Sequence, residues 1–169
     1  MSGENTSKDG VVEKMDRVMK ALDDYEESAG LHAHIPPGEE TELQEYFVLD
    51  RRSIEAMLPK EAASASVRLS AFAFYLQREV NREDTRVSWC TDQLDDVIAK
   101  ELGQYDKYMK HEMKVSLIAQ NNVYAGKVLR LKRYAEKRAQ RLSFLASNTK
   151  HLSEAFQAVQ RANWKPHNE

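Results

Sequence analysis

Apolar residues in the last third of the chain recur at the spacing of a helix that packs along its whole length. Counted from Tyr124 in alternate steps of four and three, the positions up to Val159 are apolar except Arg138 and Thr149. Such a run over five heptads predicts a long helix packed against other helices. An intramolecular bundle and an oligomer both satisfy the pattern, and the alternatives stay open at this stage.

In the oligomer alternative, the interface is expected along the apolar seam of this helix. A polar residue on such a seam typically fixes register or pairs across the interface, and Arg138 is expected to do so. The expected interface residues are Val128, Leu131, Arg138, Leu142, Leu145, Leu152, Phe156 and Val159.

The same stretch carries most of the chain's positive charge. Residues 126–169 hold ten Lys and Arg against three acids, a net +7, whereas residues 1–66 hold seven against fifteen, a net −8. Five of the cations, here called the basic stripe, fall on the side of the predicted helix that neighbours its seam: Lys127, Arg130, Arg133, Lys137 and Arg141. A solvated surface and a site for a polyanion or an acidic partner both fit a stripe with so few acids.

Composition favours an all-α fold, a helical bundle with a long C-terminal heptad helix. The 169 residues include only six Gly and four Pro, and 31% of them are charged, which suits helices better than a sandwich or barrel. The β-prone segment 46–49 allows one short strand or an extended segment. Three segments are expected: 1–45, an acidic and partly disordered extension with a short amphipathic helix; 46–120, a central helical region; and 121–165, the basic heptad helix.

Local signals refine this division. The short helix is expected to use Val11, Met15, Val18, Leu22 and Tyr25 as its apolar face. Residues 60–102 contain no Gly or Pro, so one long helix or two shorter ones fit. Residues 115–119 read as a short extended piece, and the next helix is expected to start at residues 121–122.

The sequence predicts a protein that is not an enzyme and has no cofactor and no metal site. No phosphate-binding loop, dinucleotide fingerprint, nucleophile elbow or zinc-protease motif is present. Cys90 is the only cysteine, which excludes an intrachain disulfide, and it is expected in the core. His32 and His34 are the best metal candidates, but two loop histidines are more often incidental. Without an apolar run of membrane-spanning length or a signal peptide, the protein is expected to be soluble and cytoplasmic, with no membrane partner.

Aromatic residues lie among the cations from residue 105 onward. Cations that track phosphates, together with rings on which any base stacks, are typical of proteins that bind single-stranded nucleic acid without reading its sequence. Tyr105 and Tyr124 are expected in the core, whereas Tyr108 and Tyr134 lie nearer the cations. The candidate DNA-binding residues are Lys100, Lys107, Lys110, Lys114, Lys127, Arg130, Arg133, Tyr134, Lys137 and Arg141.

The order of elements over residues 86–165 resembles the UvsY family of recombination mediators of T4-type phages. The resemblance rests on Glu112-Met-Lys114, a short apolar piece, a polar turn at residues 121–122 and a long helix that ends near Arg161 and Trp164. Ile98-Ala-Lys100-Glu-Leu102 is also similar to the Lys-x-Arg-Leu stretch that binds DNA in that family, with Lys100 matching its lysine. The resemblance implies a ring-like homo-oligomer built through C-terminal helices. It also implies single-stranded DNA, a RecA-like recombinase and a displaced single-strand-binding protein as partners, with the host cytoplasm as the compartment for a phage-encoded protein.

The sequence therefore predicts a recombination mediator that binds single-stranded DNA non-specifically and helps to load a recombinase. Many weak phosphate contacts become tight binding when an oligomer repeats them. The alternative is a helical structural or adaptor protein, such as a phage assembly component, whose basic stripe meets an acidic protein.

Overall fold

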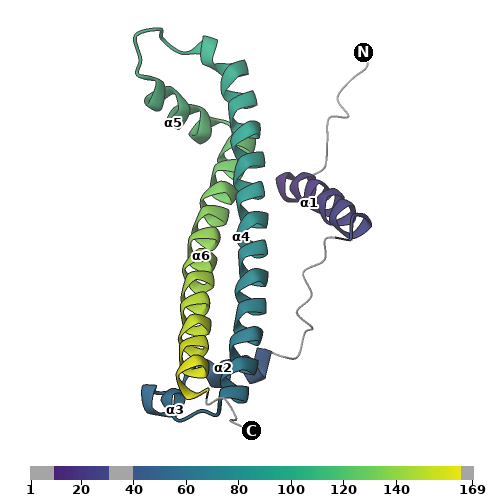
Figure 1. Ribbon diagram of the computed structural model, residues 1–169. Coiled ribbons are helices and arrows are strands. Elements are labelled where there is room, and N and C mark those ends of the chain that lie inside the picture. Colours follow the sequence, from purple (N-terminus) through teal and green to yellow (C-terminus); the bar gives the residue numbers. More distant parts are fainter. Residues whose placement is uncertain (1–9, 31–39, 165–169) are drawn as a thin grey trace. The chain divides into compact units, whose positions relative to one another are not determined.

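The protein is all-α, as the sequence predicts. The computed structural model describes residues 10–30 and 40–164, and within these residues there is no strand. Figure 1 shows the order of the elements. They are α1 (Val11–Ser28), α2 (Glu40–Phe47), α3 (Arg51–Glu55), α4 (Pro59–Glu101), the 3-10 turn η1 (Leu102–Gln104), α5 (His111–Asn121) and α6 (Val123–Asn163).

Two of these helices are very long. The segment after Pro59, for which one helix or two were expected, forms the single 43-residue helix α4, and α6 has 41 residues. Pro59 occupies the first position of α4, where a helix does not need the amide hydrogen that proline lacks. The absence of Gly and Pro from the following residues leaves nothing to break α4 before Leu102.

The chain divides into two compact units, each holding one half of α4 and one half of α6. Unit 1 comprises residues 1–32 and 81–139, and unit 2 comprises residues 33–80 and 140–169. Each unit therefore draws on segments far apart in the sequence and pairs a half-helix of α4 with a half-helix of α6.

In unit 1, α1 and α5 contribute side chains to the core formed with α4 and α6. The core contains Val11 from α1, Cys90 and Leu94 from α4, Ile118 from α5 and Val128 from α6. Cys90 is fully buried, as expected, and burial raises the pKa of its thiol because the thiolate is poorly solvated there.

The amphipathic helix α1 belongs to the core of unit 1. Val11, Met15 and Met19 are its buried side chains. The expected apolar face was therefore partly wrong, because Val18, Leu22 and Tyr25 are exposed. The buried residues of α1 follow a spacing of four, whereas the expected face alternated steps of four and three. Both rows of side chains are apolar and lie next to each other on the helix, so the sequence alone does not show which of them is buried.

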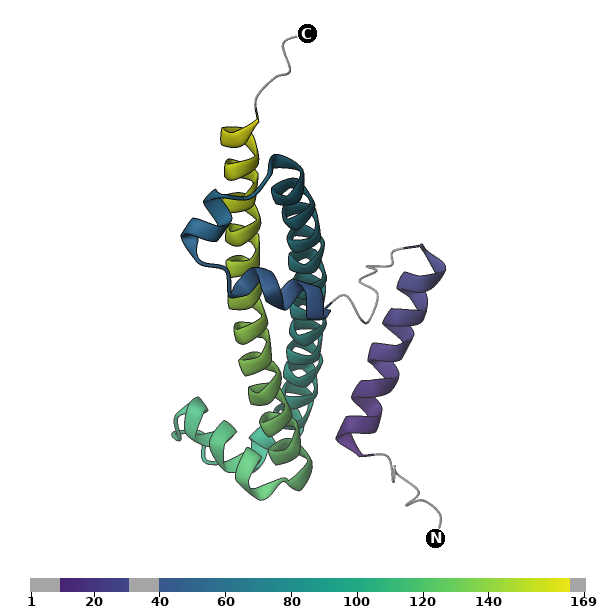
Figure 2. The same ribbon diagram turned by 90° about the horizontal axis from the view of Figure 1, so that it is seen from below.

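Unit 2 has its own core beneath α2. Phe156 of α6 is fully buried and packs with Leu69 of α4 and Leu43 of α2. The ring of Tyr46 meets Phe156 edge-on, with centroids 5.7 Å apart. Figure 2 shows α2 crossing the paired helices. Residues 46 and 47, where a strand was an option, are thus the last turn of a helix, because packing against Phe156 overrides their β propensity.

The buried row of α6 follows the predicted heptad at only half of its positions. Val128, Thr149 and Phe156 are fully buried, as the pattern requires, but Leu145 is 40% exposed and the next residue, Ala146, is 6% exposed. The same shift of one residue brings Ala139 and Ser153 into the buried row. Small side chains allow two helices to approach closely, so they occupy the seam here in place of the bulkier residues beside them.

Val128 and Phe156 are buried in the cores of their own chain. At these two positions the heptad seam packs as an intramolecular bundle does. Leu131, Leu142, Leu152 and Val159 are half-buried.

The expected extended piece at residues 115–119 is wrong, because these residues lie inside α5. Ile118 is fully buried in the core of unit 1, with Val115 one turn earlier and half-buried. A short apolar run fits a strand or a helix equally well, and burial of this one face decides for the helix. The helix start expected at residues 121–122 is confirmed, because α6 begins at Val123 directly after Asn122.

Candidate nucleic-acid interface

Four residues of the basic stripe form an exposed surface on the unit 1 half of α6. We call Lys127, Arg130, Arg133 and Lys137 the basic face; all four side chains are exposed. At about 100° per residue they lie on the side of the helix away from buried Val128. The sequence had suggested the side next to the seam. The difference follows from the one-residue shift of the buried row.

The basic face is not neutralised by neighbouring acids. Among residues 10–30 and 40–164, no ion pair involves any of its four members, and the one hydrogen bond joins Arg130 Nε to the Gly126 carbonyl oxygen at 3.4 Å. Four cations without counter-charges give this surface a positive electrostatic potential.

Tyr134 adds an aromatic ring to the same face. It is 64% exposed and lies among the four cations on the outer side of α6. Tyr105 and Tyr124 pack against the core of unit 1, and the Tyr124 hydroxyl donates a hydrogen bond to Gln93 Oε1 at 2.6 Å. The division of the tyrosines between core and surface is the one expected from the sequence.

Arg138 has a partner within its own chain. Its Nε lies 3.4 Å from Oε1 of Glu83, a buried carboxylate that Arg86 also pairs with. The expectation that Arg138 occupies the seam was wrong, because Ala139 is buried in its place. A buried carboxylate requires cationic partners, and Arg138 supplies one of them to Glu83.

The other candidate cations lie on several elements. Lys100 lies at the end of α4, Lys107 and Lys110 lie in the connection to α5, and Lys114 is half-buried in α5. Lys107 Nζ lies 5.0 Å from the ring of Tyr108, which is exposed. Arg141 of the basic stripe belongs to unit 2, where it is exposed.

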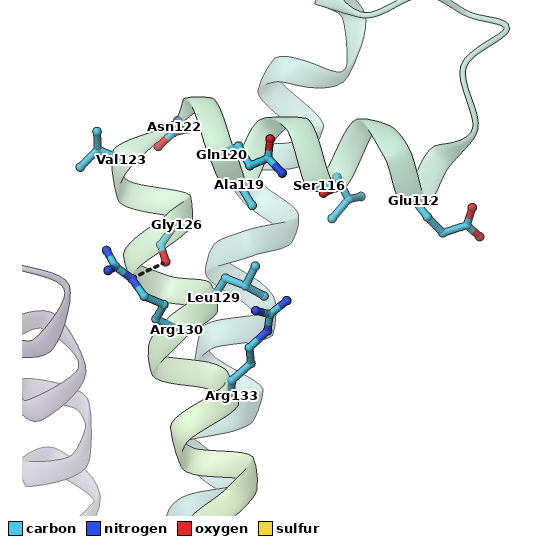
Figure 3. A pocket seen from close by; sticks show the side chains of 11 residues that line it. Glu112, Ser116, Ala119, Gln120, Asn122, Val123, Gly126, Leu129, Arg130 and Arg133 are labelled. Atoms are coloured by element: carbon cyan, nitrogen blue, oxygen red, sulfur yellow. Dashed lines mark hydrogen bonds between the residues drawn. The ribbon is translucent and has the colours of Figure 1, made fainter.

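A pocket of about 590 Å³ lies in the corner between α5 and α6, next to the basic face. Figure 3 shows α5 leading into α6 at Asn122, with Leu129 and Arg133 on the part of α6 beneath α5. Val115, Ser116, Ala119 and Gln120 of α5 form the opposite wall. We call this cavity the corner pocket. The sequence did not predict this pocket, because residues 115–119 on its α5 wall were expected to be extended.

Side-chain contacts fix the corner. The Asn122 side chain accepts a hydrogen bond from the Ala125 amide at 3.0 Å and donates one to Glu101 Oε1 at 2.5 Å. The first contact caps α6, and the second ties the corner to the end of α4. At Gly126, an added Cβ would lie 2.8 Å from the Ala119 carbonyl oxygen. Glycine therefore allows the backbones of α5 and α6 to meet.

Replacing Gly126 with alanine is expected to destabilise the protein. Alanine favours a helix by about 1 kcal/mol over glycine, but here its methyl group collides with backbone that has little room to move. Overpacking of this kind typically costs about 1–3 kcal/mol. Urea unfolding, with hydrogen exchange of the α5 amides, measures the change. Gln140→Ala, at an exposed position of α6, is the control and should stay within about 0.5 kcal/mol of the wild type. Stabilisation by Gly126→Ala would contradict the close approach.

Among the described residues, no group of three or more His, Cys, Asp or Glu side chains is placed to hold a metal ion. His32 and His34 lie outside the described residues. No helix within the described ranges has the length and hydrophobicity needed to cross a membrane.

Comparison of the chain with protein-family models, curated proteins and solved structures gave no match.

Proposed function

We propose that the protein binds single-stranded DNA without sequence preference through the basic face of α6. The observation that carries the proposal is the exposure of Lys127, Arg130, Arg133 and Lys137 on one side of a helix, without ion pairs to the described residues. Repeated cations on one surface bind phosphates and release the counterions condensed on the nucleic acid.

Tyr134 supports single-stranded over double-stranded DNA as the ligand. An exposed ring among cations offers a stacking surface to an unpaired base, whereas the bases of a duplex are already stacked on one another. The second exposed ring near cations, Tyr108, lies close to Lys107 in the connection before α5. Tyr108 offers a second stacking surface, on which the strand would continue.

The biological role we propose is that of a recombination mediator, which forms a homo-oligomer on single-stranded DNA and helps a RecA-like recombinase displace a single-strand-binding protein. This part rests on the resemblance to the UvsY family. Val128 and Phe156 are buried within their own chain, so self-association would use other residues, and the exposed Leu145 is the one we propose.

A helical adaptor protein is the second candidate function. It is favoured by exposed apolar residues in unit 2 that DNA binding leaves without a role. Val67 and Phe74 lie two turns apart on α4, and both are exposed. Phe74 borders a groove of about 480 Å³ between α4 and α6. An adaptor would use this groove for an apolar partner and the basic face for an acidic one.

Photocrosslinking to a strand that contains iodouracil tests the proposed interface. We expect the crosslink on Tyr134, because this reagent couples to aromatic rings that touch the base. Tyr25 and Trp164, each 66% exposed and off the basic face, serve as internal controls. Crosslinks confined to the two controls would contradict the proposal, and a crosslink confined to Tyr108 would move the site to Lys107 and Lys110. A chain that forms no complex with the strand would favour the adaptor.

A further inference from the structure

We infer that the corner pocket holds one nucleotide of the bound strand, with the base inside the pocket and its phosphate at Arg133. The inference rests on the proposed function, because it assigns a binding site for one base of the strand that the basic face binds. The pocket volume of about 590 Å³ falls within the range of about 300–1,000 Å³ that is usual for small-molecule sites.

The walls of the pocket suit the two faces of a base. Val115 and Ala119 of α5 and Leu129 of α6 are half-buried apolar side chains that line it. Apolar walls remove the ring faces of a base from water, and this is the main source of binding energy in such sites.

Polar groups in the pocket suit the edge of a base. The Ser116 hydroxyl and the Gln120 amide are exposed, and within the described parts of the chain neither has a hydrogen-bond partner. A hydroxyl and an amide each provide a donor and an acceptor, so they match the mixed donor and acceptor groups of a base edge.

Charge at the pocket sets the orientation of the nucleotide. Arg133 brings positive charge from α6, whereas Glu112 brings a carboxylate from the first turn of α5. A carboxylate repels phosphate but accepts a hydrogen bond from the amino group of cytosine. The phosphate therefore lies toward Arg133, and the base points toward Glu112. The same carboxylate disfavours an acidic peptide as the occupant.

Packing at the corner keeps the pocket open before the ligand arrives. Asn122 is held by the Ala125 amide and by Glu101, and the α5 backbone rests on Gly126. A preformed site avoids the entropic cost of ordering its walls on binding.

The test compares the binding of full-length protein to oligo-dC and to an abasic strand of equal length and charge. The wild type is expected to bind oligo-dC about fivefold or more tightly than the abasic strand, the lower end of what one stacked base contributes. Ser116→Trp fills the pocket from an exposed position on α5, so it should lower the ratio about fivefold, the share of one stacked base. Stacking on Tyr134, outside the pocket, is unaffected by this change. Because Ser116→Trp removes no cation, the salt dependence of binding should not change.

Met113→Trp is the matched control, since Met113 is exposed on α5 and does not line the pocket. It should keep the wild-type ratio. Gln120→Ala is a second variant that does not depend on a bulky side chain, and it should lower the ratio in part. Circular dichroism checks that each variant is folded.

The outcomes separate this inference from the proposed function. Equal binding of both strands by the wild type, with a normal salt dependence, would overturn nucleotide binding in the corner pocket and base stacking on Tyr134, and would leave the basic face as a phosphate-binding surface. A ratio that falls equally in Ser116→Trp and Met113→Trp would also overturn it. Failure of the wild type to bind either strand would remove the proposed function and this inference with it.

Discussion

Phe156→Ala is expected to destabilise the protein by about 3–5 kcal/mol, the usual cost of truncating a fully buried phenylalanine. Phe156 has no exposed surface and packs between α2 and α4 in the core of unit 2. Its loss removes apolar burial and the edge-on contact with Tyr46, and it leaves a cavity. The midpoint of urea unfolding, followed by circular dichroism, measures the effect.

Phe144→Ala is the matched control for this prediction. It makes the same chemical change in the same helix, but Phe144 is 70% exposed, so the expected change is within about 0.5 kcal/mol. Similar losses for the two variants would mean that α6 buries a different row of side chains. A large loss for Phe144→Ala alone would indicate an oligomer that covers it.

The long heptad pattern predicts the fold class because it depends only on local spacing. A period of three and four residues places side chains on one helical face whatever the partner helix is. The choice between two adjacent rows depends on how closely α4 approaches. Ala139 and Ala146 are buried because the paired helices are close. The heptad pattern had placed the neighbouring residues Arg138 and Leu145 on the seam instead.

The charged part of the candidate site was also visible in the sequence. Lysines and arginines repeat with helical spacing between residues 127 and 141, so they share a face in any helix that covers this range. The pairing of Arg138 with Glu83 was not visible, since the two residues are 55 positions apart and no periodic signal joins them.

The corner pocket depends on contacts that no local pattern encodes. It requires α5 to be helical and to end at Asn122, with its backbone against Gly126. One signal in the sequence is consistent with this contact, a glycine within the first turn of a long helix. Such a glycine, which costs helix stability, often marks a close approach between backbones.

Neutralising the basic face is the other change with a large expected effect. Because binding to a single strand scales with about −0.7 log units per log unit of salt for each phosphate contact, one contact is worth about fivefold at about 0.1 M salt. Loss of four contacts should therefore weaken binding about 10²- to 10³-fold. The quadruple variant carries Ala at residues 127, 130, 133 and 137.

A control variant of equal charge separates a local site from general attraction. Four exposed cations of unit 2 are replaced with Ala, namely Arg52, Lys60, Lys150 and Arg161. Both variants lose four cations, which takes the formal net charge from −2 to −6. Effects of net charge alone are therefore the same in the two proteins.

The most direct test is the slope of log binding constant against log salt concentration, measured with the same labelled oligonucleotide for the wild type and both variants. The basic face predicts that the slope shrinks by about 2.8 in the quadruple variant, four contacts at about 0.7 each, and stays close to wild type in the control. An unchanged slope in the quadruple variant, or an equal reduction in the two variants, would contradict a binding site on this face of α6.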